Sequence, residues 1–389
     1  MIPFTYYSPT KIIFGPHQEI HIGEIIANYG YKKILFHYGK HSIFQTGLYQ
    51  RVIASLQQAQ IDYVEFGGVE PNPKIDLVRK GVQLVKEEQI DFILAVGGGS
   101  VIDSAKSIAC GACVDFDPWL FHTHEKTPEQ ALPIGVILTI SAAGSELSNS
   151  CVVSHPQYHI KNGFNTDCVR PLFAIMNPEL TYSVSPYQTA CGIVDILMHT
   201  LERYLVVESS LSFTDEIALA LLKSVVQAGK KVQLYPQDYE ARATLMIASS
   251  FSHNGLTGMG VKMYFTVHKL EHILSGMYDQ IAHGAGLAIL FPAWLKYISS
   301  YLVDKCYRLF VEVFGIEEKS KEKTIAEGIE ALKQFFSNLG MPVSWKEIGL
   351  NEPQLQELID RATKANTQMI PGFLPLDQQA IQTIFNYAK

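Results

Sequence analysis

Two helix-like segments carry acidic and imidazole side chains at intervals that place them on one helix face. Asp195 and His199 are four residues apart in "GIVDILMHTLERYL". His268 and His272 repeat this spacing in "HKLEHILSGMYDQIAHG", and His283 follows eleven residues later. Residues four apart project from one side of a helix, about one turn from each other. Each pair alone is weak evidence, because a histidine on an apolar helix face is more often a hydrogen-bonded core residue than a ligand.

The convergence of one aspartate with several histidines in mostly apolar segments favours a metal site. Such side chains are costly to bury unless they are paired or bound to a metal. One carboxylate and three imidazoles suit a divalent transition metal, Fe(II) or Zn(II), and suit calcium or magnesium poorly. "HKLEH" resembles the zinc-protease helix, but its glutamate is misplaced for a general base. "FHTHEK" (121–126) is interpreted as a solvated loop.

A glycine-rich loop between an apolar strand pattern and a helix is the second chemical feature. "FILAVGGGSVIDSAKSIA" places Gly98, Gly99 and Ser100 at the start of that helix. Glycines let the backbone approach a ligand closely, and free amides at a helix start favour a phosphate group. A pyrophosphate would fit there, although a tight turn is an equal alternative. Asp103 either complements the helix dipole or holds a cofactor group.

The end of the strand pattern at 32–39 indicates which dinucleotide is bound. In folds of this type an acid at that place hydrogen-bonds the adenosine ribose and repels a 2′-phosphate. Here the strand end reads "HYGKHSI", and a cation stands where the acid is expected; the residues are Gly39, Lys40, His41 and Ser42. NADP(H) is therefore favoured over NAD(H).

The elements that must position these residues show two different sequence patterns, one in each half of the chain. In the first half, short apolar runs alternate with helical periods, and the five runs are 32–39, 62–68, 92–98, 134–140 and 172–178. This alternation predicts an α/β domain with a parallel sheet covered on both faces. From about residue 185 long amphipathic helices dominate. We therefore predict an α/β dinucleotide-binding domain over 1–184 and an all-α, metal-binding and catalytic domain over 185–389.

Composition excludes several classes of function. The 389 residues are 47% hydrophobic and 18% charged with a net charge of −7, so disorder and nucleic-acid binding are not expected. No apolar run approaches the roughly 18 residues of a membrane span, and no signal-peptide pattern opens the sequence. Six scattered cysteines in apolar surroundings fit a reducing compartment. A cytoplasmic protein is expected, and "CGAC" (110–113) is interpreted as non-redox.

Taken together, these motifs resemble those of the iron-containing (group III) alcohol dehydrogenases, especially their NADP-dependent butanol dehydrogenase or aldehyde reductase branch. The resemblance runs nearly end to end and is carried by "YYSPTKIIFG", "GGVEPNP", "GGGSVIDSAKSIA", "LTISAAGSE", "GIVDILMHTLERYL", "HKLEHILSGMYDQIAHGAGLAILFPAW" and "FFSNLGMPVSW". It implies the dehydroquinate synthase-like fold and a homodimer.

The resemblance also implies roles for individual residues. The four metal ligands are Asp195, His199, His268 and His283, and His272 matches a histidine near the nicotinamide that is proposed to assist proton transfer. The cofactor-contacting positions are Gly98, Gly99, Ser100 and Asp103, together with Asn72, Thr139 and Lys161. Gly39 falls where an NAD-preferring member carries aspartate.

Three departures from the family pattern stand out. The interval from His268 to His283 is one residue longer, so the loop absorbs an insertion or the last ligand is displaced. Ala143 replaces a common threonine, and Asn177 replaces a frequent aspartate. None of these removes a ligand.

Hydride transfer between NADP(H) and a primary alcohol or aldehyde is the function these features predict. The alternative role for His272 is a hydrogen bond that orients a metal-binding residue. Two rival functions are a sugar-phosphate lyase of the dehydroquinate synthase type and a non-catalytic metal or nucleotide binder. The lyase would need several cations around the metal, yet Lys262 and Lys269 are the only basic residues between 250 and 295. Apolar segments such as "LAILFPAW" instead favour a short-chain or aromatic aldehyde.

Overall fold

The computed structural model describes residues 2–207 and 211–389, which divide into two compact units. One unit is Tyr7–Val184; the other joins Ser185–Lys389 to the N-terminal residues 2–6. The sequence places residues 2–6 in the α/β domain, and the structure does not. The amide of Ile2 donates to Gly260 O (3.0 Å), and Asn254 Nδ2 donates to the hydroxyl of Tyr6 (3.0 Å). These bonds span about 250 residues of sequence, so no local pattern could reveal them.

The unit Tyr7–Val184 contains a six-stranded, fully parallel sheet in the order β1-β8-β5-β4-β2-β3. Strands β6 and β7 form a separate antiparallel pair. The strands are β1 (Lys11–Phe14), β2 (Lys33–Tyr38), β3 (Asp62–Phe66), β4 (Phe92–Gly97), β5 (Ile134–Leu138), β6 (Ser150–His155), β7 (Ile160–Asn165) and β8 (Phe173–Met176). The predicted α/β class is confirmed; the edge strand β1 and the pair β6–β7 were not among the predicted strands.

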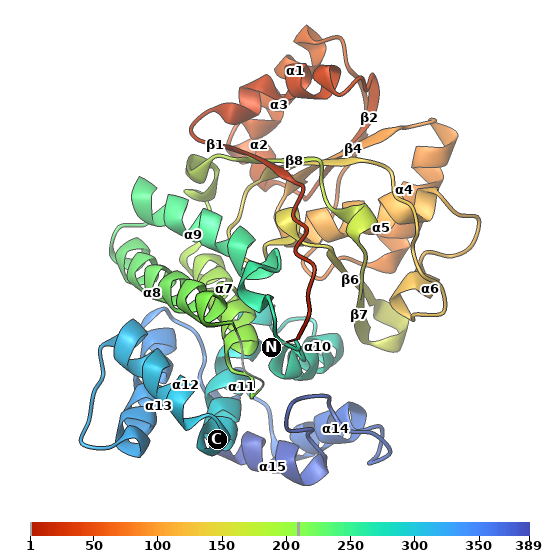
Figure 1. Ribbon diagram of the computed structural model, residues 1–389. Helices are drawn as coiled ribbons and strands as arrows, with labels where there is room; N and C mark the ends of the chain where they lie inside the picture. The colour runs from red at the N-terminus through yellow and green to blue at the C-terminus, as the bar shows by residue number, and fades with distance from the viewer. Residues whose placement is uncertain (1, 208–210) are drawn as a thin grey trace. The chain divides into compact units, whose positions relative to one another are not determined.

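Helices cover both faces of this sheet, as its continuous apolar strands require. Helices α1 and α3 lie on one face and α4 and α5 on the other (Figure 1). The helices are α1 (Ile22–Asn28), α2 (Ser42–Gln45), α3 (Leu48–Gln58), α4 (Ile75–Glu87), α5 (Gly99–Ala112) and α6 (Trp119–His122). The helix expected over 42–60 is interrupted at Gly47, whose φ of 67° lies in the left-handed region.

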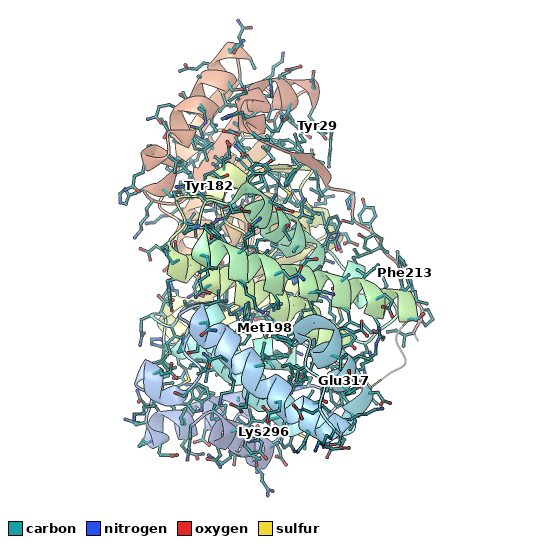
Figure 2. The ribbon with its side chains drawn as sticks, turned by 90° about the vertical axis from the view of Figure 1, so that its left-hand side faces the viewer. Tyr29, Tyr182, Met198, Phe213, Lys296 and Glu317 are labelled. Carbon is teal, nitrogen blue, oxygen red and sulfur yellow. The ribbon has the colours of Figure 1, made fainter. Side chains whose placement is uncertain are left out.

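The C-terminal unit is helical, as the sequence predicts. Its helices are α7 (Pro186–Tyr204), α8 (Ser212–Leu234), α9 (Tyr239–His253), α10 (Thr266–Met277), α11 (His283–Ile298), α12 (Val303–Leu309), α13 (Lys321–Asn338), α14 (Glu352–Ala362) and α15 (Gln378–Tyr387). Helix α7 packs against α8, α9 and α11 and is buried over most of its circumference. Figure 2 shows Met198 of α7 within this bundle, whereas Phe213 lies at the exposed start of α8.

Within the described residues, no helix combines the length and the hydropathy that a bilayer crossing needs. All six cysteines are free thiols.

Candidate functional site

Helix α7 presents three acidic or imidazole side chains on one buried face. Ser185 caps the helix, its hydroxyl accepting from Gln188 N at 3.2 Å. Asp195 and His199 are one turn apart, and Glu202 follows after nearly one further turn. All three side chains are buried. The helix therefore sets their order and spacing before any tertiary contact forms.

Glu202 connects α7 to the first turn of α10. Its two carboxylate oxygens accept from the amides of Val267 (2.7 Å) and His268 (3.2 Å). These are amides that a helix start leaves without an intrahelical partner. The ring Nδ1 of His268 also donates to Glu202 Oε2. One buried carboxylate thus fixes both the backbone and the ring of His268.

Glycines allow α11 to approach α7 and α10 at close range. A Cβ on Gly284 would lie 2.5 Å from the backbone of Cys191 in α7. A Cβ on Gly286 would lie 2.9 Å from the side chain of Glu271 in α10. The "HGAG" sequence therefore brings His283, the first residue of α11, against both helices. There its Nδ1 donates to Glu271 Oε2.

The carboxylate of Asp195 lies at the centre of three imidazoles. Its Oδ1 is 3.7 Å from Nδ1 of His199 and 3.5 Å from Nε2 of His268. Nε2 of His283 lies 3.6 Å from the same oxygen. Asp195 Oδ1, His199 Nδ1 and His268 Nε2 are buried and make no hydrogen bond. Buried polar atoms that converge without bonding each other fit the binding of a cation.

The separations fit a cation bound between these atoms. Ligand atoms about 2.1 Å from a tetrahedral metal lie roughly 3.4 Å from one another. Asp195, His199 and His268 form one group whose ligand atoms are all within 4.8 Å, and Glu271, His272 and His283 form a second. His283 joins the two groups through its approach to Asp195. Despite the longer interval after His268, His283 lies within 3.6 Å of the Asp195 carboxylate.

Hydrogen bonding sets the imidazoles in the form that a metal ligand needs. A carboxylate accepts only, so Nδ1 of His268 carries the hydrogen and Nε2 is left facing Asp195. The same reasoning applies to His283 and Glu271. Burial, with His253 and His268 nearby, lowers the pKa of His199 well below its usual value, so this ring is neutral. Burial also opposes a charge on His268, but Glu202 and Asp195 outweigh it and raise its pKa to about 9. A proton and a cation therefore compete for this ring.

The charges of the buried side chains also fit a bound cation. The cluster contains three buried carboxylates, those of Asp195, Glu202 and Glu271, and one buried guanidinium, that of Arg203. With neutral imidazoles, these buried groups carry two excess negative charges. Such charges are costly in an interior unless they are compensated. A divalent cation would balance them.

Arg203, His253 and Phe265 form a layer beside His199. Nη1 of Arg203 donates to His199 O and to Ser252 O (2.8 Å for the latter), and Nη2 lies 3.1 Å from His253 Nδ1. The His253 ring packs on His199 with centroids 4.1 Å apart. Phe265 packs edge-on against His268 at 5.3 Å and has a φ of 52°, a strained value for a bulky residue. These contacts restrain the backbone and the ring of His199, and Phe265 adds an apolar ring.

Sequence reasoning missed Glu202, Glu271 and His253. The signal for Glu202 was present, because Asp195, His199 and Glu202 follow one helical face. Glu271 was noted only as a misplaced protease base, whereas its partner is His283. His272, half-buried, lies with its ring centroid 5.5 Å from that of His283. The structure thus brings His272 to the cluster.

The prediction that "FHTHEK" is a solvated loop is wrong for its first histidine. His122 ends α6 and is fully buried. Its Nε2 lies 3.0 Å from Ser107 Oγ and its Nδ1 3.1 Å from Asn162 O. His124 is exposed, as expected. The ring of His122 is therefore a hydrogen-bonded core group.

In the α/β unit, the glycine loop joins β4 to α5 as predicted. Gly98 is the N-cap of α5, and a Cβ there would lie 2.1 Å from Ile140 Cγ2. A Cβ on Gly99 would lie 3.3 Å from Ala143. The chain after β5 therefore passes directly over the loop. Gly98, Gly99 and Ser100 are half-buried at the start of a fourteen-residue helix, which suits a phosphate.

Three of the remaining candidate cofactor residues follow the carboxyl ends of strands of the parallel sheet, Gly39 after β2, Asn72 after β3 and Thr139 after β5, whereas Lys161 lies in β7. Thr139 follows β5, and its amide donates to Gly97 O at 3.1 Å. Gly39 follows β2 and lies close to Val101 of α5. Ser154 connects Lys161 with the segment of Asn72. It pairs with Lys161 in the β6–β7 sheet, and its amide donates to the carbonyl of Pro73, the residue after Asn72. Such strand ends are where ligands bind in open α/β sheets.

Two of the predicted cofactor residues, Lys40 and Asp103, form an ion pair or hydrogen bonds with other residues of the protein. Lys40 is exposed and forms an ion pair with exposed Glu70 at 2.5 Å. Asp103 accepts from Ser145 Oγ at 2.5 Å and from Val152 N at 3.1 Å. His41 and Ser42 are exposed at the start of α2. The Asp103 carboxylate is therefore part of the framework of the loop.

A parallel α/β unit with a glycine loop, joined in one chain to a helical unit with a carboxylate and imidazole cluster, defines a class of two-domain proteins suited to a dinucleotide and a metal. Comparison with known proteins identifies the family. The model described as iron-containing alcohol dehydrogenase matches residues 9–178, and the C-terminal model of the Fe-containing alcohol dehydrogenase family matches 189–388. The chain therefore belongs to the iron-containing alcohol dehydrogenase family, and the predicted resemblance is confirmed.

Relatives match along nearly the whole chain. NADH-dependent butanol dehydrogenase A of Clostridium acetobutylicum is 38% identical over 387 residues, covering 99% of each chain. The NADPH-dependent aldehyde reductase YqhD of Escherichia coli is 34% identical over 361 residues, covering 92% of each. The crystal structure of NADH-dependent butanol dehydrogenase A from Thermotoga maritima superposes with a TM-score of 0.95 at 36% identity, covering 99% of this chain and 98% of that one.

Proposed function

We propose that this protein transfers a hydride between NADP(H) and a primary alcohol or aldehyde, using a divalent metal, Fe(II) or Zn(II). The α/β unit would bind the dinucleotide and the helical unit the cation. The ligands would be Asp195, His199, His268 and His283. The names of the relatives, butanol dehydrogenases and an aldehyde reductase, support the substrate class.

One observation carries the proposal. Three buried ligand atoms, Asp195 Oδ1, His199 Nδ1 and His268 Nε2, have no hydrogen-bond partner and lie at separations suited to one bound ion. A protein without such a cation would leave them unpaired at a cost of about 1–3 kcal/mol for each neutral group and more for the carboxylate. The donor set of nitrogen with one oxygen suits Fe(II) or Zn(II).

When bound, the cation supplies Lewis acidity towards the alcohol or aldehyde oxygen, and the nicotinamide gives or takes the hydride. The side chains of the protein hold these groups in place. Glu202 and Glu271 keep the Nε2 atoms of His268 and His283 turned inward. His272, one turn from His268 and half-buried, would pass the hydroxyl proton towards solvent. Phe265, whose ring lies edge-on to His199 and His268, would offer an apolar surface to the substrate.

The preference for NADP(H) is supported by the end of β2, where Gly39, Lys40, His41 and Ser42 carry no carboxylate. Lys40 and Glu70 are both about half exposed, and an exposed ion pair is worth little, so the ammonium can turn to a 2′-phosphate. Relatives named as NADH-dependent and as NADPH-dependent both match this chain. Cofactor choice therefore has to be measured.

A spectrophotometric assay tests the proposal. We expect oxidation of NADPH with butanal, loss of the activity on chelation and recovery with Fe(II) or Zn(II). Asp195→Asn should abolish the recovery, whereas Asp304→Asn, the same change at an exposed residue of α12, should not. No turnover across a broad panel of aldehydes with either dinucleotide would contradict the proposal and reopen the lyase and non-catalytic alternatives.

The cytoplasmic homodimer stays a prediction, which sedimentation and cell fractionation would test.

A further inference from the structure

Lys106 lies on the cofactor helix α5 as a fully buried cation. Its side chain has no exposed surface. Nζ donates to three backbone carbonyls, those of Ser145 (2.7 Å), Ser150 (2.8 Å) and Ser148 (2.9 Å). An ammonium has three hydrogens, so these bonds use its full donor capacity. The hydroxyls of Ser145 and Ser148 lie further away, at 3.1 and 3.3 Å.

Asp103, one turn earlier on α5, holds the ends of the same segment. Its carboxylate accepts from the Ser145 hydroxyl and from the amide of Val152. Ser145 is thus shared: its hydroxyl donates to Asp103 while its carbonyl accepts from Lys106. Burial raises the pKa of Asp103 and lowers that of Lys106 to about 8, and the opposite charge of each residue works against the shift of the other. Together they bind the segment 145–152 to one face of α5.

The segment held in this way continues the chain that crosses the glycine loop. Thr139 is bonded to Gly97, and Ile140 and Ala143 pack on Gly98 and Gly99. The stretch 139–152 is therefore fixed at its start by the loop and at its end by Lys106 and Asp103. The separation between the stretch 139–152 and the start of α5 depends on both attachments.

A buried lysine is a costly way to stabilise a fold, because an apolar side chain of similar volume fills the space without desolvating a charge. An apolar replacement could not, however, fix the direction of three carbonyl groups. Binding sites need their walls held to within a fraction of an ångström. This precision is what the charged residue adds.

We infer that Lys106 and Ser145 are positioning residues for the dinucleotide: they set the distance of the stretch 139–152 from the glycine loop. The inference rests on the proposed function, since it requires that the cofactor binds there. Neither residue touches the reacting atoms. Their loss should weaken cofactor binding and leave the chemical step largely intact.

The test measures the Kd of NADPH and of NADH by fluorescence on metal-stripped full-length protein, with KM and kcat of the reloaded enzyme. We expect Lys106→Met and Ser145→Ala to raise Kd and KM for the cofactor about tenfold, with kcat at saturating cofactor changed by less than about threefold. Ser148→Ala, which removes the 3.3 Å contact to Lys106 Nζ and the 3.3 Å bond from the Ser150 amide, should raise Kd about twofold.

Ser107→Ala is the matched control. Ser107 is the next residue of α5 and equally buried, but its hydroxyl bonds to His122. It should lower the melting temperature without changing Kd, which separates loss of stability from loss of positioning. If Lys106→Met does not fold, Ser145→Ala decides.

Wild-type Kd values in Ser145→Ala and in any folded Lys106→Met would overturn the inference. So would an equal rise of Kd in the Ser107→Ala control. If the wild type itself binds neither dinucleotide, the proposed function fails first.

Discussion

The carboxylate of Glu202 accepts hydrogen bonds from both the backbone amide and the ring Nδ1 of His268. The residues are 66 positions apart in sequence. The glutamate accepts hydrogen bonds from free amides at the start of α10 and, at the same time, orients the ring of His268 so that Nε2 faces Asp195. A single side chain therefore couples the start of a helix to the orientation of a candidate ligand.

Glu202→Gln should weaken metal binding about 10- to 100-fold, because the amide keeps the shape but loses the charge that holds the ring. Competition with a chromophoric chelator on the folded protein measures this. Glu271→Gln should act similarly through His283, while Glu330→Gln, an exposed change on α13, serves as the control. Unchanged metal affinity in both buried variants would show that these carboxylates do not orient the ligands.

Metal removal should lower the stability of the protein. A cation that binds only the folded state adds about 2.7 kcal/mol at one hundred times its Kd. The melting temperature of stripped wild-type protein should therefore rise on addition of Zn(II), and that of Asp195→Asn should not. Calorimetry with Asp304→Asn as control checks this, and equal rises in all three proteins would place the ion elsewhere.

Acid should destabilise the α/β unit through two buried histidines. Burial lowers the pKa of His37 and of His122 to about 4 from an ordinary value near 6.5. The unfolded chain thus binds more protons between these values, so this stabilisation is complete above pH 6.5 and is lost as pH falls towards 4. Each group adds a slope of up to about 1.4 kcal/mol per pH unit.

Hydrogen exchange of peptides from β2 and α5 measures this locally. His37 bonds Phe66 O and Ser104 Oγ at 2.7 and 2.9 Å, so it links those elements. His37→Gln should reduce the pH slope by about one proton, whereas replacement of exposed His124 should not change it. A wild-type slope retained in His37→Gln is the contrary outcome.

Alkylation should favour Cys168 over the more exposed Cys113. A hydrogen bond from Cys110 lowers the pKa of Cys168 to about 6, whereas burial raises that of Cys113. At pH 7 iodoacetamide should therefore modify Cys168 first, as followed by peptide mass spectrometry. Cys110→Ala should slow the reaction and Cys306→Ala should not. Faster labelling of Cys113 would refute the assignment.

Gly39→Asp should shift cofactor preference towards NADH. A Cβ there meets Val69 O at 3.7 Å and Val101 at 3.9 Å, which are ordinary contacts, so the side chain fits. Its carboxylate would repel a 2′-phosphate, and kcat/KM with NADPH should fall at least about tenfold relative to NADH. Gly39→Ala, which adds only the Cβ, is the control. A similar shift with alanine would make the effect steric.

The sequence by itself determined the alternation of strands and helices in 32–178, the helical second half and the spacing of Asp195 and His199. These are local properties: a buried strand is a continuous apolar run, and residues four apart share a helix face. The glycine loop could also be predicted, because consecutive glycines between a strand pattern and a helix show directly that the backbone there must leave room for a close approach. The family resemblance added the pairing of His268 and His283 with that helix.

Tertiary structure decided which distant groups became partners. It paired Glu202 with His268, buried His122 against Ser107, and attached residues 2–6 to the helical unit. It also brought Cys168 to Cys110, although the sequence shows only scattered thiols. Each of these contacts joins segments from 15 to some 250 residues apart. Such pairings follow from how helices and strands pack, and packing is a property of the whole fold that no local period encodes.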